Sequence, residues 1–415
     1  MNTPSNGLVP KNVVDNLREL QSLTSDSNGA QRVAWTETWE KARSWLHRKL
    51  ETLPVEIEID EAGNTWATLH GQSPRSLVIG SHIDSVPNGG WLDGALGVVA
   101  GLEVLRRISA QGVPPVTVRL VSWADEEGAR FSFSLFGSGT AAGFMDPAGL
   151  LDRTDREGVR MPAALAAHGV ELESACKAGR QLKDMSVYLE LHIEQGPVLE
   201  HKGLPLGVVL GTLGVERHAV RFTGQTAHAG STPMDLRRDA LAAAAKLELE
   251  IREIARRNGG VCTMGSVVTH PGIVTAVVGM CDVLLDQRCL DPDALARMLA
   301  EAQAASRRFA DEEGVTVEWK RLFQIEPISF HPELIDLCAA SVSATGGEVY
   351  RLPSGPLHDA SYISRAGIPT AMLFVQSLKG LSHTPVEDTC TDHLVLSIEA
   401  LDRLADTTME WILRR

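Results

Sequence analysis

Five short segments of the chain carry histidine and carboxylate side chains of the kinds that bind transition-metal ions. Imidazole and carboxylate groups suit Zn, Mn, Co or Ni. Two such ions close together can share a water molecule and make hydroxide available near neutral pH. The pattern therefore predicts a two-metal hydrolytic site. The segments are residues 80–85 (GSHIDS), 91–94 (WLDG), 124–128 (ADEEG), 190–196 (ELHIEQG) and 380–385 (GLSHTP).

The first two segments supply His82, Asp84 and Asp93. In an HxD pattern at a strand end, the aspartate can hold one imidazole nitrogen and so fix the tautomer for a metal on the other. The alternative is a histidine in an ordinary hydrogen-bond network. Asp93 lies in a glycine-flanked loop, whose permissive backbone lets a carboxylate point inward, although an isolated loop aspartate is more often a turn former. The occurrence of all three together favours metal ligands.

Glu126 and Glu127 follow closely after the apolar run 116–123. Acidic pairs are usually solvated, but carboxylates at the end of a buried strand are unfavourable unless a cationic group lies nearby. Two metal ions would supply that charge. One carboxylate can then bind metal while its neighbour takes a proton from the shared water.

Four further residues are weaker candidates when each is considered alone. His192 follows another apolar strand, where a hydrogen-bonded core histidine is the alternative, and His383 lies in a loop. Arg288 ends a predicted strand and could clamp a substrate carboxylate through two hydrogen bonds, although strand-end arginines more often form surface ion pairs. His228 lies in the segment 227–231 (AHAGS).

Apolar runs predict the strands that must position these groups. Continuous apolar strands separated by helices indicate an α/β fold, with a mainly parallel sheet covered by helices on both faces. Sites in such sheets form at the carboxyl ends of strands, where His82, the glutamate pair and His192 fall. Residues 11–50 are also predicted to be helical. The predicted strands are 77–81, 116–123, 186–191 and 371–376, with a buried helix at 97–108 between the first two.

The middle of the chain has a different order of elements: strand, helix, strand, strand, helix, strand. This order is the split βαβ or ferredoxin-like arrangement. We therefore predict a catalytic domain formed by 1–212 and 329–415, interrupted by an inserted α/β domain at 213–328. The predicted elements of the insertion are strands at 217–224, 262–269, 277–287 and 315–322, and helices at 235–257 and 292–311.

The composition argues against several classes of protein. The chain has 415 residues and is 44% hydrophobic, enough for a large core. Its 39 basic and 53 acidic side chains give a net charge of −14, which argues against nucleic acid as a partner. No uncharged apolar run approaches the ~20 residues needed to cross a bilayer, and residues 1–7 lack the features of a secretory signal. Six scattered cysteines are typical of reduced thiols in a cytoplasmic protein.

The five segments and their surroundings resemble dinuclear metallohydrolases of the aminoacylase/carboxypeptidase type, and more narrowly the hydantoinase/carbamoylase branch. That branch contains N-carbamoyl-L-amino-acid hydrolases, β-ureidopropionases, allantoate amidohydrolases and ureidoglycolate amidohydrolases. The resemblance spans most of the chain in the family's order. It rests on residues 80–86 with 89–90, 125–131, 137–138, 191–200, 228–234 with 237–240, and 382–385.

The resemblance implies a role for each metal-binding residue. Asp93 would bridge two divalent ions, each being Zn, Mn, Co or Ni. His82 and His192 would complete the site of one ion, and Glu127 and His383 the site of the other.

The resemblance also implies the catalytic groups and the substrate contacts. Glu126 would be the general base, and Asp84 would hold His82. His228 would reach in from the inserted dimerisation (lid) domain of the other protomer of a homodimer to polarise the scissile carbonyl. Arg288 would bind the substrate carboxylate. Gln195, His358 and Asp359 would line the site.

Three positions near the expected substrate depart from the family's pattern. Thr275 stands where these enzymes usually carry an asparagine, Val278 replaces a proline, and Leu357 replaces a glycine. Because Thr275 and Leu357 fall among the substrate-binding positions, the departures concern substrate identity and leave the metal chemistry intact.

The expected substrate is a small ureido or N-acyl carboxylate. The expected reaction cleaves the linear C–N bond of an N-carbamoyl amino-acid-like carboxylate and gives the amino acid, carbon dioxide and ammonia. An N-acyl amino acid amidohydrolase or a dipeptidase on the same metal site is the alternative, and the departures make it more attractive. A non-catalytic metal-binding protein is disfavoured, because such a protein has no need of a free base such as Glu126 beside its ligands.

Overall fold

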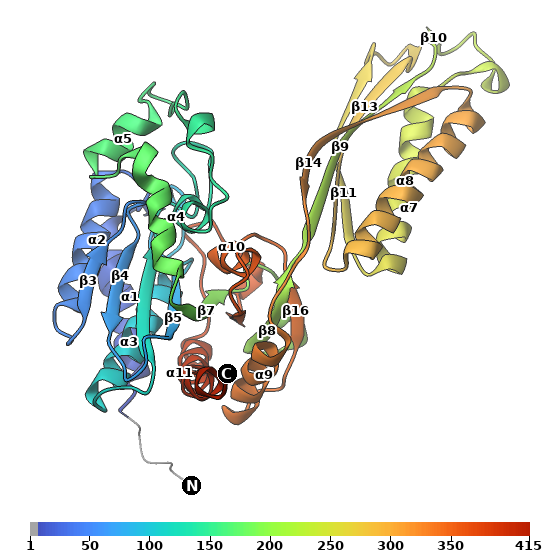
Figure 1. Cartoon of the computed structure of the whole chain (residues 1–415). Helices are drawn as coiled ribbons and strands as arrows, with labels where there is room; N and C mark the ends of the chain where they lie inside the picture. Colours follow the sequence, from blue (N-terminus) through green and yellow to red (C-terminus); the bar gives the residue numbers. More distant parts are fainter. Residues whose placement is uncertain (1–6) are drawn as a thin grey trace. The chain divides into compact units, whose positions relative to one another are not determined.

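The computed structural model describes residues 7–415, which form two compact units (Figure 1). The first unit comprises residues 7–210 and Phe330–Arg415, and the second comprises Gly211–Ser329. The sequence predicted an insertion at 213–328. Residues 1–6, which make up most of the segment that lacks secretory features, lie outside the described residues.

The first unit is a sheet flanked by helices, together with the short paired strands β1 (Ser25–Asp26) and β2 (Gly29–Ala30). The sheet strands are β3 (Glu56–Ile59), β4 (Thr65–Leu69), β5 (Ser76–His82), β6 (Thr117–Trp123), β7 (Met185–Ile193), β8 (Leu206–Thr212), β16 (Arg351–Ser354) and β17 (Thr370–Val375). The short strand β15 (Ile328–Ser329) belongs to the second unit and pairs with the last residues of β8. The helices are α1 (Pro10–Thr24), α2 (Glu37–Leu50), α3 (Ala95–Ala110), α4 (Phe136–Ala141), α5 (Met161–Ala167), α6 (Val198–Lys202), α9 (Pro332–Ala344), α10 (Asp359–Arg365) and α11 (Thr391–Arg414). Short 3-10 turns are η1 (Pro147–Leu150), η2 (Leu172–Leu182) and η4 (Leu378–Gly380).

This sheet is mixed. Its strand order is β15-β8-β17-β7-β5-β6-β4-β3, with β16 beside β8. The central pairs β17–β7, β7–β5 and β5–β6 are parallel, whereas β17–β8, β8–β15, β6–β4 and β4–β3 are antiparallel. The expected parallel arrangement thus holds for the strands that carry the candidate ligands. Antiparallel pairing at the edges follows from connections such as residues 60–64 between β3 and β4, which are too short for a crossover helix.

The central strands of the sheet position the candidate site. β5 and β6 are buried along their whole length. Helix α11 packs on α3 and on α9, and all three pack on the central strands, while α4 and α10 pack on each other. Helix α3 approaches the sheet closely at Gly97, where a Cβ atom would lie 2.4 Å from the carbonyl oxygen of Leu191. This close approach brings the loop before α3, which contains Asp93, next to the ends of β5 and β7.

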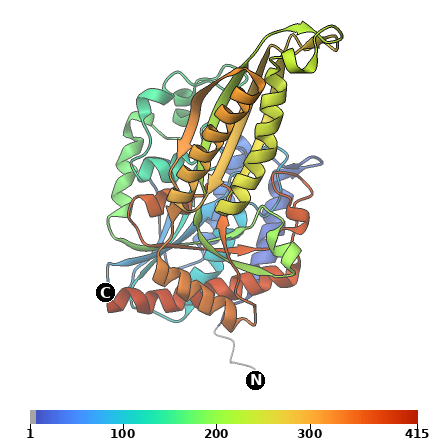
Figure 2. The same cartoon turned by 90° about the vertical axis from the view of Figure 1, so that its right-hand side faces the viewer.

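The second unit has the predicted βαββαβ order, and its two long helices lie side by side on one face of the sheet (Figure 2). The strand order is β11-β13-β9-β14, and every neighbouring pair is antiparallel. Its core contains apolar side chains of the helices and the inner strands. The elements are β9 (Gly214–Thr223), η3 (Met234–Leu236), α7 (Ala240–Asn258), β11 (Val261–His270), β13 (Met280–Cys289), α8 (Pro292–Glu313) and β14 (Thr316–Ile325), with the small pair β10 (Ala227–His228) and β12 (Ala276–Val277).

Two predicted elements of this unit differ most from the observed ones. The helix predicted at 235–257 begins at Ala240, because the carboxylate of Asp239 accepts hydrogen bonds from the backbone of Leu241 and Ala242 and so caps the helix there. The strand predicted at 277–287 is divided into β12 and β13, since β12 leaves the main sheet to pair with β10. Within residues 7–415, no helix combines the length and apolar character needed to span a bilayer.

Candidate metal centre and active site

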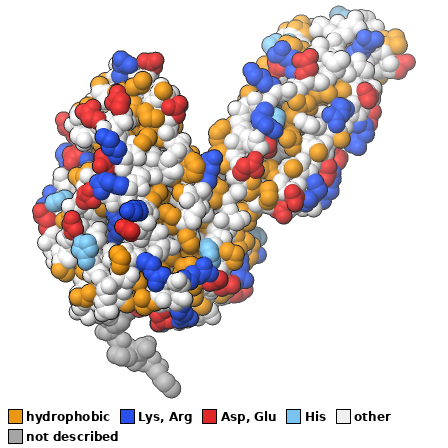
Figure 3. All heavy atoms as spheres, in the orientation of Figure 1, with side chains coloured by type: hydrophobic (Ala, Val, Ile, Leu, Met, Phe, Trp, Pro, Cys, Tyr) orange, Lys and Arg blue, Asp and Glu red, His pale blue; other side chains and the backbone are white. Residues whose placement is uncertain are grey.

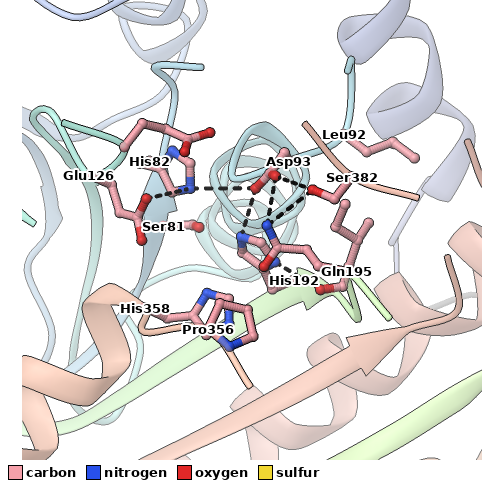
Figure 4. A network of polar contacts seen from close by, with 12 residues as sticks. Ser81, His82, Leu92, Asp93, Glu126, His192, Gln195, Pro356, His358 and Ser382 are labelled. Carbon is pink, nitrogen blue, oxygen red and sulfur yellow. Dashed lines mark hydrogen bonds and ion pairs between the residues drawn. The ribbon is translucent and has the colours of Figure 1, made fainter. Parts of the chain in front are cut away.

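Asp93 lies between His82, His192, Gln195 and Ser382 (Figure 4), and its two carboxylate oxygens face different histidines. Oδ1 is 3.2 Å from Nε2 of His192 and 3.8 Å from Nε2 of His82. Oδ2 is 3.4 Å from Nε2 of His383, which is also 3.4 Å from Oε2 of Glu127. A single buried carboxylate therefore takes part in two groups of ligand atoms. This is the arrangement that a bridging ligand requires.

The two groups have the composition of metal sites. His82, Asp93 and His192 form one group, and Asp93, Glu127 and His383 form the other. Within each group, one ligand atom per residue lies within 4.8 Å of the others. Nitrogen and oxygen donors in this combination fit divalent transition-metal ions. Four of the five residues are largely or fully buried, and His383 is half exposed, so the second group is open on one side.

Backbone carbonyl groups orient the two buried histidines. Nδ1 of His192 lies 2.9 Å from the carbonyl oxygen of Ile193, and Nδ1 of His82 lies 3.2 Å from that of Asp84. If Nδ1 of each ring carries the proton, Nε2 has a free lone pair on the side that faces Asp93. A histidine that binds a metal ion needs such a lone pair. These contacts support the fit of the residues to a metal ion.

Asp84 differs from its expected role in one respect. Its carboxylate Oδ1 lies 3.6 Å from Nδ1 of His82, farther than its own backbone carbonyl. The carboxylate instead accepts hydrogen bonds from the backbone N–H groups of Glu126 at 3.3 Å and Glu127 at 3.1 Å. Asp84 therefore connects the first histidine to the acidic pair, because these N–H groups point toward it from the turn after β6.

That turn separates the two glutamates. Asp125 has a left-handed backbone conformation with φ 55°, and its carboxylate accepts a 2.6 Å hydrogen bond from the indole of Trp35. As a result, Oε2 of Glu126 lies 3.7 Å from Nε2 of His82, whereas Glu127 lies beside His383. The two adjacent carboxylates therefore face different ligand groups.

The pKa shifts in the cluster indicate that its buried carboxylates need compensating positive charge. Burial raises the pKa of Glu126 well above its usual value, although His82 opposes this shift. Burial also raises the pKa of Glu127 to about 7. A hydrogen bond to Asp93 raises the pKa of His383 to about 9. Without metal, the cluster therefore holds extra protons that offset its negative charge, and divalent cations would take over this role.

Two polar side chains bind the Asp93 oxygen that faces the second ligand group. Nε2 of Gln195 and Oγ of Ser382 donate hydrogen bonds to Oδ2 of Asp93 at 2.8 and 2.7 Å (Figure 4). Gln195 was expected to line the site. Ser382 was missed, although its place directly before the candidate ligand His383 was a usable signal.

His358 lies beside the first ligand group. Its ring centroid is 4.4 Å from that of His192, and its Nε2 is 2.9 Å from Oγ of Ser354. Burial and the neighbouring His192 lower the pKa of His358 well below its usual value, so the ring is neutral. Leu357, which precedes it, is partly exposed, and Asp359, which follows, is fully buried at the start of α10.

Glu190, His192 and His358 could form a third ligand group by spacing alone. The oxygens of Glu190 already accept hydrogen bonds from the hydroxyl groups of Ser81 at 2.8 Å and Tyr188 at 3.2 Å, and from a backbone N–H of α10 at 3.0 Å. The group also shares His192 with the first site. It therefore adds no independent metal site.

Three expected site residues lie in the second unit, at its two ends. His228 pairs with Ala276, and the N–H of Ala229 donates to the carbonyl oxygen of Thr275, so His228 and Thr275 share one tip. Arg288 lies at the far end of β13, where its guanidinium group pairs with Asp286 at 2.8 Å. At about 3.4 Å per residue, β13 alone separates the two ends by about 27 Å.

The backbone around His228 selects its tautomer. Nδ1 accepts hydrogen bonds from the N–H groups of Gly230 and Ser231, each at 3.2 Å. In the neutral ring the proton must then lie on Nε2, and the side chain is exposed. His228 thus presents a hydrogen-bond donor to solvent.

Comparison with known proteins decides the family. The model of peptidase family M20/M25/M40 matches residues 78–407. The chain belongs to this family. Among relatives of this M20-family chain, the N-carbamoyl-L-amino acid amidohydrolase of Geobacillus stearothermophilus is 34% identical over 381 residues, which cover 90% of the chain and 92% of the relative. The allantoate amidohydrolase of Escherichia coli strain K12 is 32% identical over 395 residues, covering 94% and 95%.

Solved structures that resemble this chain are amidases of the same kind. A crystal structure of a hydantoinase/carbamoylase family amidase from Burkholderia multivorans matches with a TM-score of 0.87 and 30% identity, covering 97% of this chain and 98% of the other. These matches confirm the expected resemblance to hydantoinase/carbamoylase-type amidases and the expected fold class. The M20-family chain is an amidohydrolase that acts on amide C–N bonds, and hydrolases of this family depend on metal ions.

Proposed function

We propose that this M20-family amidohydrolase uses two divalent metal ions to hydrolyse the linear C–N bond of an N-carbamoyl amino-acid-like carboxylate. The observation that carries the proposal is the position of Asp93, whose oxygens face two different groups of nitrogen and oxygen donors. His82 and His192 would hold one ion with Asp93, and Glu127 and His383 the other. When bound, the ions would supply Lewis acidity and a water molecule of lowered pKa.

Glu126 is the residue that we assign to proton transfer. Its carboxylate lies 3.7 Å from His82 and belongs to neither ligand group that shares Asp93 among the described residues. Burial raises its pKa well above the usual value, which favours a group that first accepts and later returns a proton. Glu126 would take the proton of the attacking water and deliver it to the leaving nitrogen.

The substrate class is argued from relatives and from charge. The two curated relatives are named for N-carbamoyl amino acid and allantoate substrates, both of which contain a ureido group beside a carboxylate. Arg288 is the proposed partner of that carboxylate. Hydrolysis of a carbamoyl substrate would yield the amino acid, carbon dioxide and ammonia. Thr275 and Leu357 stand where this branch usually has asparagine and glycine, so an N-acyl amino acid or a dipeptide is the second candidate.

We further propose that the enzyme acts as a homodimer. His228 and Arg288 are both assigned to one substrate, yet they lie at opposite ends of the second unit, about 27 Å apart along β13. One chain cannot bring both to the same small molecule from the same copy of this unit. A His228 from a second copy would resolve the conflict, with its Nε2–H donating to the scissile carbonyl oxygen.

The surface of the second unit offers means of pairing. β11 is an edge strand, and its side chains Val261, Val267 and Val268 are about half exposed. The tip that carries His228 also exposes Ile273 and Val274, the latter at 96%. Hydrophobic side chains are visible among the charged ones on this unit (Figure 3). A long exposed edge strand with apolar side chains favours pairing with another chain.

Activity assays on a panel of substrates with defined metals test the proposed reaction. Chelator-treated protein should be inactive and should regain activity with Mn, Co, Ni or Zn, and elemental analysis should find two ions per chain. The panel contains N-carbamoyl-L-amino acids, allantoate, ureidoglycolate, β-ureidopropionate and N-acyl amino acids. We expect the highest kcat/KM for a ureido substrate. Full activity of metal-free protein would contradict the mechanism, and preference for an N-acyl substrate would select the second candidate.

A further inference from the structure

The loop that presents Asp93 is held from behind by Glu387. Its Oε1 accepts hydrogen bonds from the backbone N–H groups of Leu92 and Asp93, each at 3.0 Å. Glu387 is 2% exposed and packs against Gly90, where a Cβ atom would lie only 2.1 Å from Oε1. The loop is therefore packed tightly against Glu387, and the hydrogen bonds of Glu387 fix the position of the Asp93 backbone.

The other end of the same loop is held by Arg32, which is fully buried. Its Nε donates to the carbonyl oxygen of Ile83 at 2.8 Å, and its backbone N–H donates to Oγ of Ser85 at 3.1 Å. These contacts fasten the segment that directly follows His82 and contains Asp84. Arg32 and Glu387 thus hold the two ends of one loop that begins and finishes at candidate ligands.

The two residues are also coupled by charge. Nη1 and Nη2 of Arg32 and Oε2 of Glu387 are buried and have no hydrogen-bond partner among residues 7–415. Burial lowers the pKa of Arg32, and Glu387 opposes that shift more than Asp84, Asp93 or Glu127 does. A buried guanidinium group without direct partners is unfavourable unless negative charge lies nearby. Glu387 is the first of these acidic groups in its effect on Arg32, although burial raises the pKa of Glu387 itself to about 7.

We propose that Glu387 and Arg32 are paired positioning residues that set the geometry of the two-metal site through the loop 83–93. This inference rests on the proposed metal centre at Asp93. Because Asp93 would serve both ions, loss of Glu387 should weaken the binding of both together. Loss of a ligand of one group, such as Glu127, should weaken chiefly one ion.

Metal binding by Glu387→Ala and Glu387→Gln tests the proposal. Mn²⁺ is titrated into the chelator-treated full chain by calorimetry, and bound metal is counted by elemental analysis. For Glu387→Ala we expect the dissociation constants of both ions to rise by about 10–100-fold, as when other groups that hold metal ligands are removed. Glu387→Gln keeps an acceptor oxygen and should have a smaller effect. Excess Mn²⁺ should restore activity in both variants.

Two further variants separate geometry from charge. Gly90→Ala places a methyl group against Glu387 and should reproduce the loss of metal affinity with no change in charge. The double variant Arg32→Met with Glu387→Gln removes both charges. The rise in its Mn²⁺ dissociation constant should be smaller than the product of the rises in the two single variants, because the effects of residues that act as a pair are not additive.

Asp155→Asn is the matched control. One oxygen of Asp155 accepts hydrogen bonds from the backbone of Glu157 and Val159 at 3.0 and 2.8 Å, and the other accepts from Arg130 at 2.9 Å. The variant should lower the Tm and leave both dissociation constants unchanged. Wild-type metal constants in folded Glu387→Ala or Gly90→Ala, or an equal loss in Asp155→Asn, would overturn the positioning role. Failure of the unaltered chain to bind metal would instead overturn the two-metal site itself.

Discussion

The adjacent residues Glu126 and Glu127 have different surroundings although they share one turn. Glu126 faces His82 at 3.7 Å, whereas Glu127 lies 3.4 Å from His383 and accepts a hydrogen bond from the backbone N–H of Val86 at 3.3 Å. Glu127 is thus placed among the donors of the second ligand group. Glu126 instead lies beside His82, where a base could reach a water molecule held by bound metal.

Replacement of Glu126 by glutamine tests this division of roles. Glu126→Gln removes the group that accepts the proton and leaves the ligand groups in place, so metal content should remain near that of the unaltered enzyme. kcat should fall by about 10²–10⁴-fold, the usual contribution of a general base. Elemental analysis and steady-state kinetics provide the measurement.

Glu127→Gln is the control, since it should lower metal content as well as activity. If Glu126→Gln instead loses a metal ion while Glu127→Gln keeps both, the two assignments are reversed.

At the scale of elements, three turns that follow central strands share an unusual backbone. Asp125 after β6, Gln195 after β7 and His383 beyond β17 have φ values of 55°, 56° and 57°. Residues other than glycine occupy this left-handed region at a cost, and they gather at functional sites. In each case the conformation turns a side chain of the turn, or of the next residue, toward the candidate ligands.

The start of α3 offers a test at this scale. Gly94 precedes the helix with φ 62°, and a Cβ atom there would lie 2.3 Å from the ring of His82. Gly94→Ala should therefore displace a ligand, lowering metal content and the free energy of unfolding. The left-handed conformation alone accounts for about 1–2 kcal/mol of that loss.

Gly112→Ala controls for backbone strain at the other end of the same helix. Gly112 has φ 101° with no atom within 4 Å of an added Cβ. This variant should lose stability and keep its metal. Equal metal content in the two variants would contradict the steric explanation for Gly94.

At the scale of the whole molecule, the proposed dimer is tested by complementation. A His228→Ala protomer and a Glu126→Gln protomer should each be nearly inactive. Mixed after reversible dissociation, they would form heterodimers in which one site has both groups intact. Activity should return to at most about a quarter of the wild-type value, because random pairing makes half the dimers mixed, with one working site of two.

A tagged pull-down must first establish that heterodimers formed. No recovery in such heterodimers would place His228 in the site of its own chain or outside catalysis. The same mixing with Asp155→Asn in place of His228→Ala provides a positive reference, because Asp155 takes no part in the proposed reaction.

The sequence alone was sufficient to predict the candidate ligands and the fold class. These histidines and carboxylates are detectable because each signal is local: a strand of seven to nine residues either carries a candidate ligand at its end or is followed by one within a few positions. The ferredoxin-like order of the second unit was equally visible from alternating strands and amphipathic helices. The predicted positions of helix and strand ends were less accurate. The cap at Asp239 and the pairing of β12 with β10 depend on hydrogen bonds that the periodicity of the sequence does not reveal.

The tertiary structure decided which oxygen of Asp93 faces which histidine, and which residues hold that carboxylate in place. Ser382 and Glu387 bond to Asp93 or its backbone from 289 and 294 positions away along the chain. Arg32 was found only because its side chain is buried beside the same loop. The separation of His228 from Arg288 likewise appeared only when β13 was seen to place them at opposite ends of one unit. Contacts between residues so distant in sequence leave no local pattern, because folding, and not spacing, brings them together.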